Sequence, residues 1–181
     1  MTDSPEPVAV INLERYVPGY LTWISNKLSG GASQAYLTTF NTGIEAWRLL
    51  VLLAVERTLS AQHACRVIGM DKASASRTFK RMQADGLITM GLDPNDGRLR
   101  LASLTPKGLA LHNEIRELAL ERERALLAPL SEAERETLLD LLRRLHDNLP
   151  AVEEATKRYL QARHPHAVRK RPAKPGVGGP V

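Results

Sequence analysis

Residues 60–86 read SAQHACRVIGMDKASASRTFKRMQADG, and this stretch decides the fold. Ser60 is a good N-cap for a short helix, and Gly69 can take the left-handed conformation that closes such a helix. Asp71 is an equally good cap for a second helix, which ends near Asp85. Two helices joined by so short a turn predict a helix-turn-helix.

The second helix of this pair has an apolar face and a basic face. At about 100° per residue, the side chains that gather on the apolar face are Ala75, Phe79 and Met82. The polar and basic residues on the opposite face and its flanks are the candidate DNA contacts: Lys72, Ser74, Ser76, Arg77, Lys80 and Arg81. A helix in the major groove needs this division, because one face packs on its scaffold while the other meets phosphates and base edges.

A hairpin with a charged tip is predicted directly after this helix. Residues 87–104 read LITMGLDPNDGRLRLASL, which is two short strands around the turn-forming run DPNDG. We expect Arg98 and Arg100, two positions apart on one strand, to project from the same face, where an arginine can enter a narrow minor groove. Asp96 is expected to shape the tip by accepting backbone N–H groups or by orienting Arg98.

Long helices are predicted on both sides of a central winged helix-turn-helix at residues 42–108. Residues 13–40 and 109–162 carry narrow apolar stripes at helical spacing, which would be exposed on a monomer of this size. We therefore expect them to form a homodimer interface. Residues 1–12 read as a loose arm and residues 163–181 as a disordered basic tail. The fold class is mainly α, with a small two-stranded β wing.

Capping signals set the expected helix boundaries around this module. Thr42 and Glu45 fit a capping box that starts the first helix of the module. A threonine–proline pair at Thr105 opens a long helix. A second capping box at Ser131 starts a helix whose apolar stripe continues through Leu149.

The charge distribution indicates a polyanionic partner. The chain of 181 residues has a net charge of +5, and residues 66–108 alone carry +4. Its single cysteine cannot form an internal disulfide, we find no signal peptide, and no apolar run reaches the roughly 20 residues of a membrane span. We therefore expect a cytoplasmic protein. No catalytic or metal-ligand spacing is present, so we expect neither an enzyme nor a metal or other cofactor.

Four residues are candidates for a small-molecule pocket: Trp23, Lys27, Trp47 and Arg48. Their aromatic rings and cations could meet an aromatic carboxylate between the long helices and the DNA-binding module. In the alternative interpretation both tryptophans are core residues and Arg48 makes a structural ion pair. The sequence leaves both interpretations open.

The stretch from Trp47 to Gly108 resembles the MarR family of bacterial transcriptional regulators. The resemblance depends on an ordered series of motifs: WRLL at 47–50, GMDK at 69–72, SR at 76–77, GLI at 86–88, DPNDGR at 93–98 and LTPKG at 104–108. Gly97 departs from the family, in which a basic wing residue is common at this position. We therefore expect the DNA contact of the wing to depend more strongly on Arg98.

This resemblance implies an obligate homodimer that binds a pseudo-palindromic DNA operator. Family members are usually repressors released by a small molecule, such as an aromatic acid or a coenzyme A thioester. The alternative function is a winged-helix module that binds another protein without specific DNA binding. The basic tail either adds non-specific affinity for DNA or is a solvated terminus.

Overall fold

The computed structural model describes residues 9–94 and 96–165 of the chain. The chain forms two compact units, Met1–Arg122 and Glu123–Val181. Of the predicted N-terminal arm, residues 1–8 lie outside the described residues, and so do residues 166–181 of the predicted basic tail.

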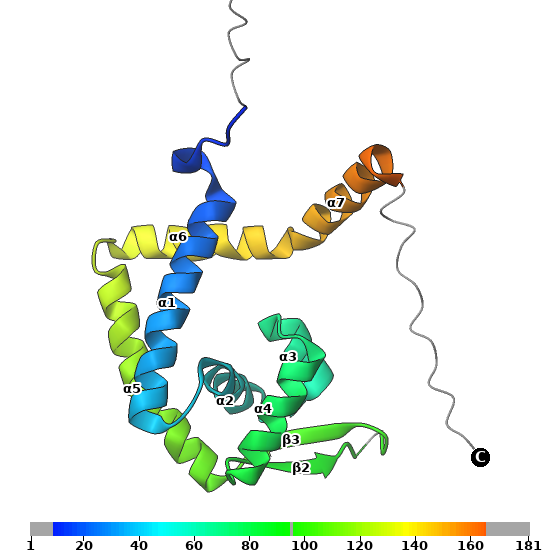
Figure 1. The fold of residues 1–181 in the computed structure, drawn as a ribbon. Helices are drawn as coiled ribbons and strands as arrows, with labels where there is room; N and C mark the ends of the chain where they lie inside the picture. Colours follow the sequence, from blue (N-terminus) through cyan, green and yellow to red (C-terminus); the bar gives the residue numbers. More distant parts are fainter. Residues whose placement is uncertain (1–8, 95, 166–181) are drawn as a thin grey trace, which may run out of the picture. The chain divides into compact units, whose positions relative to one another are not determined.

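The first unit is built from helices with one small sheet (Figure 1). Its elements in chain order are the 3₁₀ turn η1 (Leu13–Arg15), α1 (Val17–Phe40), α2 (Ile44–Glu56), β1 (Thr58–Ser60), α3 (Ala61–Ile68), α4 (Lys72–Ala84), β2 (Ile88–Leu92), β3 (Arg100–Leu104) and α5 (Pro106–Leu127), whose last residues belong to the second unit. The mainly helical fold class with its β wing is thereby confirmed.

The turn between α1 and α2 differs from the prediction. Asn41 ends α1 in the left-handed region, with φ 50°. The Thr42 hydroxyl then donates a 2.9 Å hydrogen bond back to the carbonyl oxygen of Phe40. That hydroxyl is therefore turned away from α2, which begins after Gly43 with no side-chain cap. The capping box predicted at Thr42 and Glu45 is wrong for this reason.

The predicted wing hairpin is present, and a third strand joins it. β2 pairs with β3 antiparallel, with Met90 opposite Ala102. The short strand β1 pairs with the other edge of β3, with Leu59 opposite Ala102, so the strand order is β1-β3-β2. Leu59 and Ala102 are both buried, which ties the sheet to the helical core.

The core of the first unit surrounds α2. Leu49, Leu50 and Leu53 of this helix are buried, because apolar residues occupy most of its circumference. The other buried members of this core are Ala32, Tyr36, Leu59, Ala64, Phe79, Met82, Leu87, Ile88, Ala102 and Ile115. They come from all the surrounding elements, so α2 is the scaffold against which α3 and α4 are placed.

The second unit contains the end of α5 followed by α6 (Glu132–Asp147) and α7 (Leu149–Arg163). α6 begins with the predicted capping box, in which Ser131 N donates to Glu134 Oε2 at 2.8 Å and Ser131 Oγ accepts from Glu134 N. The predicted continuous helix through Leu149 is interrupted at Asn148, because Pro150 lies in the first turn of α7.

Candidate nucleic-acid interface

α3 and α4 form the predicted helix-turn-helix. Ser60 caps α3 by accepting a 3.1 Å hydrogen bond from the N–H of His63, and Gly69 ends α3 with φ 74°. Asp71 caps α4, since its Oδ1 accepts the N–H groups of Ala73 and Ser74, both at 2.9 Å. The hydrogen bonds from Ser74, chiefly its backbone N–H, lower the pKa of the Asp71 carboxyl. These caps fix where α3 and α4 begin.

α4 has the buried apolar face and the exposed polar face that the sequence predicted. Ala75, Phe79 and Met82 are buried against the core. Ser74 is half-buried, and the other five candidate contacts on this helix are exposed: Lys72, Ser76, Arg77, Lys80 and Arg81. The structure thus gathers four cations and two hydroxyls on one outward-facing helix.

Both arginines of α4 already have partners nearby in the chain. Arg77 donates a 2.9 Å hydrogen bond from its Nη2 to Ser74 Oγ. Arg81 Nε lies 3.7 Å from Asp85 Oδ2, an exposed ion pair between residues four apart. Such exposed pairs are weak, of the order of 0.5 kcal/mol. Arg81 can therefore exchange this carboxylate for a phosphate at little cost.

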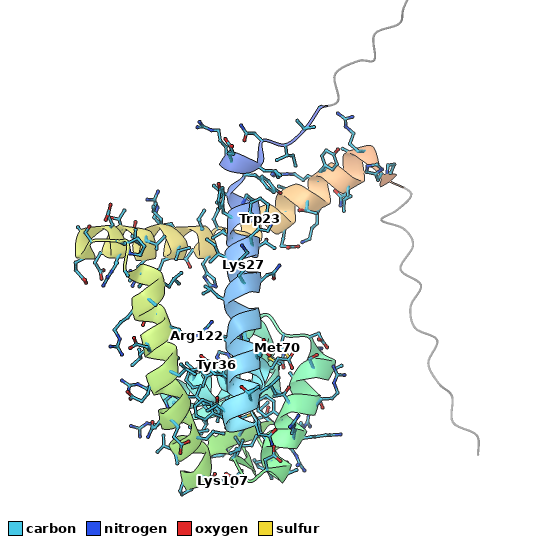
Figure 2. All side chains as sticks on the ribbon, turned by 60° about the vertical axis from the view of Figure 1, so that its left-hand side comes forward. Trp23, Lys27, Tyr36, Met70, Lys107 and Arg122 are labelled. Atoms are coloured by element: carbon cyan, nitrogen blue, oxygen red, sulfur yellow. The ribbon has the colours of Figure 1, made fainter. Side chains whose placement is uncertain are left out.

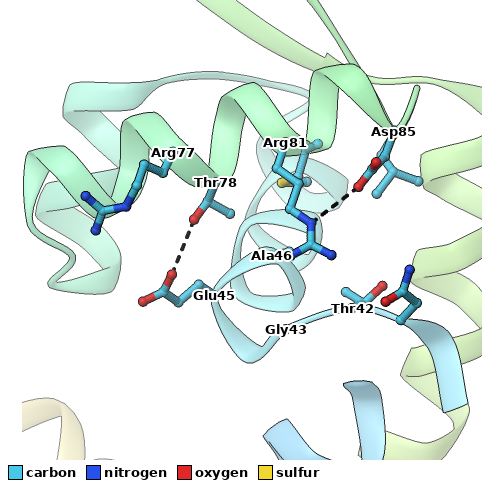
Figure 3. Close-up of a pocket in the computed structure, with 11 residues that line it drawn as sticks. Thr42, Gly43, Glu45, Ala46, Arg77, Thr78, Arg81 and Asp85 are labelled. Carbon is cyan, nitrogen blue, oxygen red and sulfur yellow. Dashed lines mark hydrogen bonds and ion pairs between the residues drawn. The ribbon is translucent and has the colours of Figure 1, made fainter. Parts of the chain in front are cut away.

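A cavity of about 210 Å³ lies between α4 and the start of α2. Figure 3 shows its two cations, Arg77 and Arg81, on one wall, with Glu45 of α2 opposite. The single proton of the Thr78 hydroxyl is shared between the carbonyl oxygen of Ser74 at 2.9 Å and Glu45 Oε2 at 3.3 Å. The longer contact, to Glu45, joins α4 to α2. The lining contains the carboxylates of Glu45 and Asp85 and the two arginine side chains, so the net formal charge around the cavity is zero.

The wing places its two arginines differently from the prediction. Arg100 begins β3, opposite Leu92 of β2, whereas Arg98 lies in the turn before the strand. The expectation that both lie on one strand is therefore wrong, because the turn extends further than the sequence suggested. Both side chains are exposed. Asp96 Oδ1 accepts the N–H of Arg98 at 3.0 Å, which is the kind of contact that shapes a turn.

The four candidate effector residues fall into two places. Trp47 and Arg48 line an apolar groove of about 340 Å³ between α2 and α3, together with Val51, Leu52, Val55, Val67 and Ile68. Trp23 and Lys27 lie on the exposed first half of α1, one turn apart, while Tyr36 is further along the helix (Figure 2). Trp23 and Lys27 are not among the described residues that line the groove.

The structural interpretation is confirmed for Trp47, which packs against the core, but is wrong for Trp23, which is 43% exposed, and for Arg48, whose hydrogen-bond partner is a hydroxyl and not a carboxylate. The Trp47 ring is half-buried; it stacks on His112 with centroids 5.5 Å apart and meets Tyr36 edge-on at 5.8 Å. Arg48 donates a 3.0 Å hydrogen bond to Ser29 Oγ of α1. Its partner is a neutral hydroxyl, so the guanidinium keeps its charge uncompensated by this contact.

The structure assembles two groups of polar contacts that the sequence analysis did not predict. One is a chain of contacts in which His63 Nε2 lies 3.0 Å from Glu56 Oε2 and His63 Nδ1 lies 2.8 Å from Arg66 Nη2. The other joins Thr105 and Lys107 to the end of α4. A cation in the first turn of a helix, where acids are favoured, was the signal that could have identified Lys107.

Between residues 9 and 165, with residue 95 left out, no helix is long and apolar enough to cross a membrane. Over the same part of the chain, no three His, Cys, Asp or Glu side chains are grouped so that they could hold a metal ion.

Comparisons with known proteins point to one family. Residues 41–99 match a model of the MarR family. The chain is 31% identical over 117 residues to the uncharacterized HTH-type transcriptional regulator YdgJ of Bacillus subtilis, covering 62% of this chain and 70% of that protein. Thus the similarity extends well beyond the helix-turn-helix itself.

Solved structures agree with this relationship. A MarR/EmrR family transcriptional regulator from Acinetobacter sp. ADP1 is 31% identical, with a TM-score of 0.72 over 78% of this chain and 99% of that one. The PcaV transcriptional regulator from Streptomyces coelicolor, solved in complex with its natural ligand, is 25% identical. Its TM-score is 0.62 over 77% of this chain and 98% of that one.

Proposed function

Because this chain belongs to the MarR family of DNA-binding transcriptional regulators, we propose that it is a homodimeric repressor of a pseudo-palindromic operator. The observation that carries the proposal is the exposed cationic face of α4 opposite its buried Ala75, Phe79 and Met82. In this arrangement α4 reads the major groove, with Arg77 suited to guanine. Lys72, Ser74, Ser76, Lys80 and Arg81 supply phosphate or base-edge contacts. Arg98 and Arg100 of the wing approach the adjacent minor groove.

The test is binding to a defined operator. Duplexes selected from a random pool by the protein should share two inverted half-sites about one helical turn apart. Binding should be at least about 10³-fold tighter than to a scrambled duplex at the same salt concentration. A protein that binds all duplexes equally weakly would favour the alternative function, a winged-helix module for another protein.

Exposed apolar residues support the homodimer. On the first half of α1 they are Val17, Tyr20, Leu21, Trp23 and Ile24, each between 43% and 53% exposed. On α6 and α7 they are Leu139, Leu141, Leu142, Leu145, Leu149, Val152, Tyr159 and Leu160. So much exposed apolar surface on long helices is typical of an interface.

Light scattering of two matched variants tests this interface. Leu142→Glu with Leu145→Glu should halve the molar mass, because both side chains lie on the apolar stripe of α6. Glu136→Lys, on the opposite face of the same helix, should leave the dimer intact. A double variant that stays dimeric would exclude α6 from the interface.

The groove between α2 and α3 supports a small effector with an aromatic or other apolar body and an acidic group. Its lining is apolar apart from Arg48, whose guanidinium can pair with a carboxylate. Trp23 and Lys27 contribute only if the effector extends beyond this groove along α1. Thermal shifts with a panel of aromatic acids and their coenzyme A thioesters should identify a ligand whose effect Arg48→Met abolishes. A ligand shift that persists in this variant would place the effector elsewhere.

We further propose that the protein acts in the bacterial cytoplasm without a catalytic step or a cofactor. The family consists of transcriptional regulators. Transcriptional regulators act by binding to or leaving a DNA site, so DNA-binding measurements are sufficient to describe this function.

A further inference from the structure

Three successive carbonyl oxygens at the end of α4 accept hydrogen bonds from the start of α5. Lys107 Nζ donates to the carbonyl oxygen of Asp85 at 2.8 Å. Thr105 Oγ1 donates to the carbonyl oxygen of Gly86 at 2.7 Å. Thr105 N donates to the carbonyl oxygen of Leu87 at 3.0 Å. We call these three contacts the α4–α5 clamp.

The Lys107 contact satisfies a backbone carbonyl group that the end of α4 leaves open. Asp85 is the C-cap of α4, and Gly86 follows with φ 71°, so the chain turns away sharply there. Carbonyl oxygens in the last turn of a helix have no partner within the helix. Side chains that donate to them define where the helix ends.

Lys107 lies at the end of its helix where a positive charge is electrostatically unfavourable. It lies in the first turn of α5, which contains no acidic residue, and a cation is disfavoured at a helix N-terminus. Its ammonium instead reaches the C-terminal end of α4, where the helix dipole and the Asp85 carbonyl both favour positive charge. Figure 2 shows Lys107 at this beginning of α5.

A close backbone approach holds the two ends together. A Cβ built on Gly108 would overlap the carbonyl oxygen of Leu87, and Gly108 N donates to Thr105 Oγ1 at 3.0 Å. Only a glycine permits this approach. The start of α5 is therefore held against the turn that ends α4. This contact places the Lys107 backbone where its ammonium group reaches the Asp85 carbonyl oxygen.

We propose that Lys107 is a positioning residue for DNA recognition, which holds the C-terminal turn of α4 through Asp85 without contacting DNA. This inference rests on the proposed function of α4 as the recognition helix. Lys80 and Arg81 lie in the last turns of α4, so a change in how that helix ends moves two of its cations. Loss of the Lys107 contact should therefore weaken specific binding.

The main experiment compares Lys107→Met with Lys107→Arg and with Arg116→Met. Arg116 is an exposed cation further along α5, so its variant controls for the loss of one charge from this helix. Each variant is titrated with the selected operator and with a scrambled duplex over a series of salt concentrations. Lys107→Met should weaken operator binding about tenfold, the scale of one charge-assisted hydrogen bond. Lys107→Arg should recover most of this loss, and Arg116→Met should bind as the parent does.

The salt dependence separates positioning from a direct contact. A lysine that neutralises a phosphate contributes about one unit to the slope of log K against log salt, and its loss weakens all sequences alike. We expect an unchanged slope and unchanged binding of the scrambled duplex in Lys107→Met. A slope smaller by about one, with equal losses on both duplexes, would overturn the proposal.

Amide hydrogen exchange without DNA tests the clamp independently of the proposed function. The N–H groups of Asp85, Gly86 and Leu87 donate to carbonyl oxygens of α4. Their exchange should become about tenfold faster in Lys107→Met, while amides of the buried middle of α2 stay unchanged. Unchanged exchange at residues 85–87 would overturn the proposal even if an operator is bound. If the parent selects no operator, the proposed function fails and this exchange still decides whether Lys107 holds α4.

Discussion

The guanidinium of Arg77 donates a 2.9 Å hydrogen bond to the hydroxyl of Ser74, one turn earlier on α4. The N–H of Ser74 is itself held by the Asp71 carboxylate, which caps the helix. Arg77, an exposed candidate for base recognition, is thus oriented before any DNA arrives. Such pre-orientation lowers the entropy lost on binding.

Arg77→Ala should weaken binding to the selected operator by about 1–3 kcal/mol, because it removes a bidentate donor from the major groove. Gel-shift titrations at fixed salt measure this loss. Discrimination should relax at one base pair of each half-site. An unchanged affinity would mean that α4 does not read bases through Arg77.

Arg98→Ala should weaken operator binding about tenfold or more while circular dichroism and molar mass stay those of the parent. The side chain is exposed, so its loss leaves no cavity in the fold. The loss should be greatest for operators with a narrow, A·T-rich minor groove beside each half-site. Equal affinities of the parent and the variant on all operators would remove the wing from the interface.

Gly108→Ala should destabilise the fold by about 3 kcal/mol or more, because the added Cβ overlaps the Leu87 carbonyl oxygen. Gly30→Ala is the matched control, since a Cβ there meets no other atom within 4 Å. It should be neutral or stabilising by up to about 1 kcal/mol, because alanine favours a helix. Urea unfolding measures both changes. Equal stabilities of the two variants would contradict the close approach.

Asp71→Asn should reduce the pH dependence of stability in acid. Hydrogen bonds from Ser74 lower the pKa of Asp71 in the folded protein, so its carboxylate stabilises the fold above the ordinary pKa. This contribution is lost as the pH falls through the lowered pKa. Asparagine still caps a helix but does not titrate. The difference in melting temperature between parent and variant should be largest near pH 7 and should shrink as the pH falls below the ordinary aspartate pKa of about 3.9.

Removal of residues 166–181 should lower the salt dependence of DNA binding, since this segment supplies Arg169, Lys170, Arg171 and Lys174. Preference for the operator over a scrambled duplex should stay that of the full chain. Salt-series titrations of both proteins measure the two slopes. Identical slopes would show that these cations stay away from DNA.

Local signals in the sequence were sufficient for most of the fold. Ser60, Gly69 and Asp71 act through neighbours within four residues, so their side chains and φ preferences define α3 and α4 without help from the rest of the chain. The spacing of Ala75, Phe79 and Met82 likewise predicts which face of α4 is buried. The division of that helix into core and candidate DNA face follows from the sequence alone.

The tertiary structure decided whatever depended on partners distant in sequence. The three residues of β1 are too few to show an alternating pattern, and they form a strand only because β3 offers an edge. The Thr42 hydroxyl could have capped α2, but the left-handed Asn41 turns it back to Phe40.

The partners of Arg48 and Lys107 lie 19 and 22 residues away. Contacts at such separations depend on how helices pack, which capping rules and helical periodicity do not encode. The sequence therefore determined which face of α4 is buried and which is exposed, and only the packing of α5 against the end of α4 brought Lys107 to the Asp85 carbonyl oxygen.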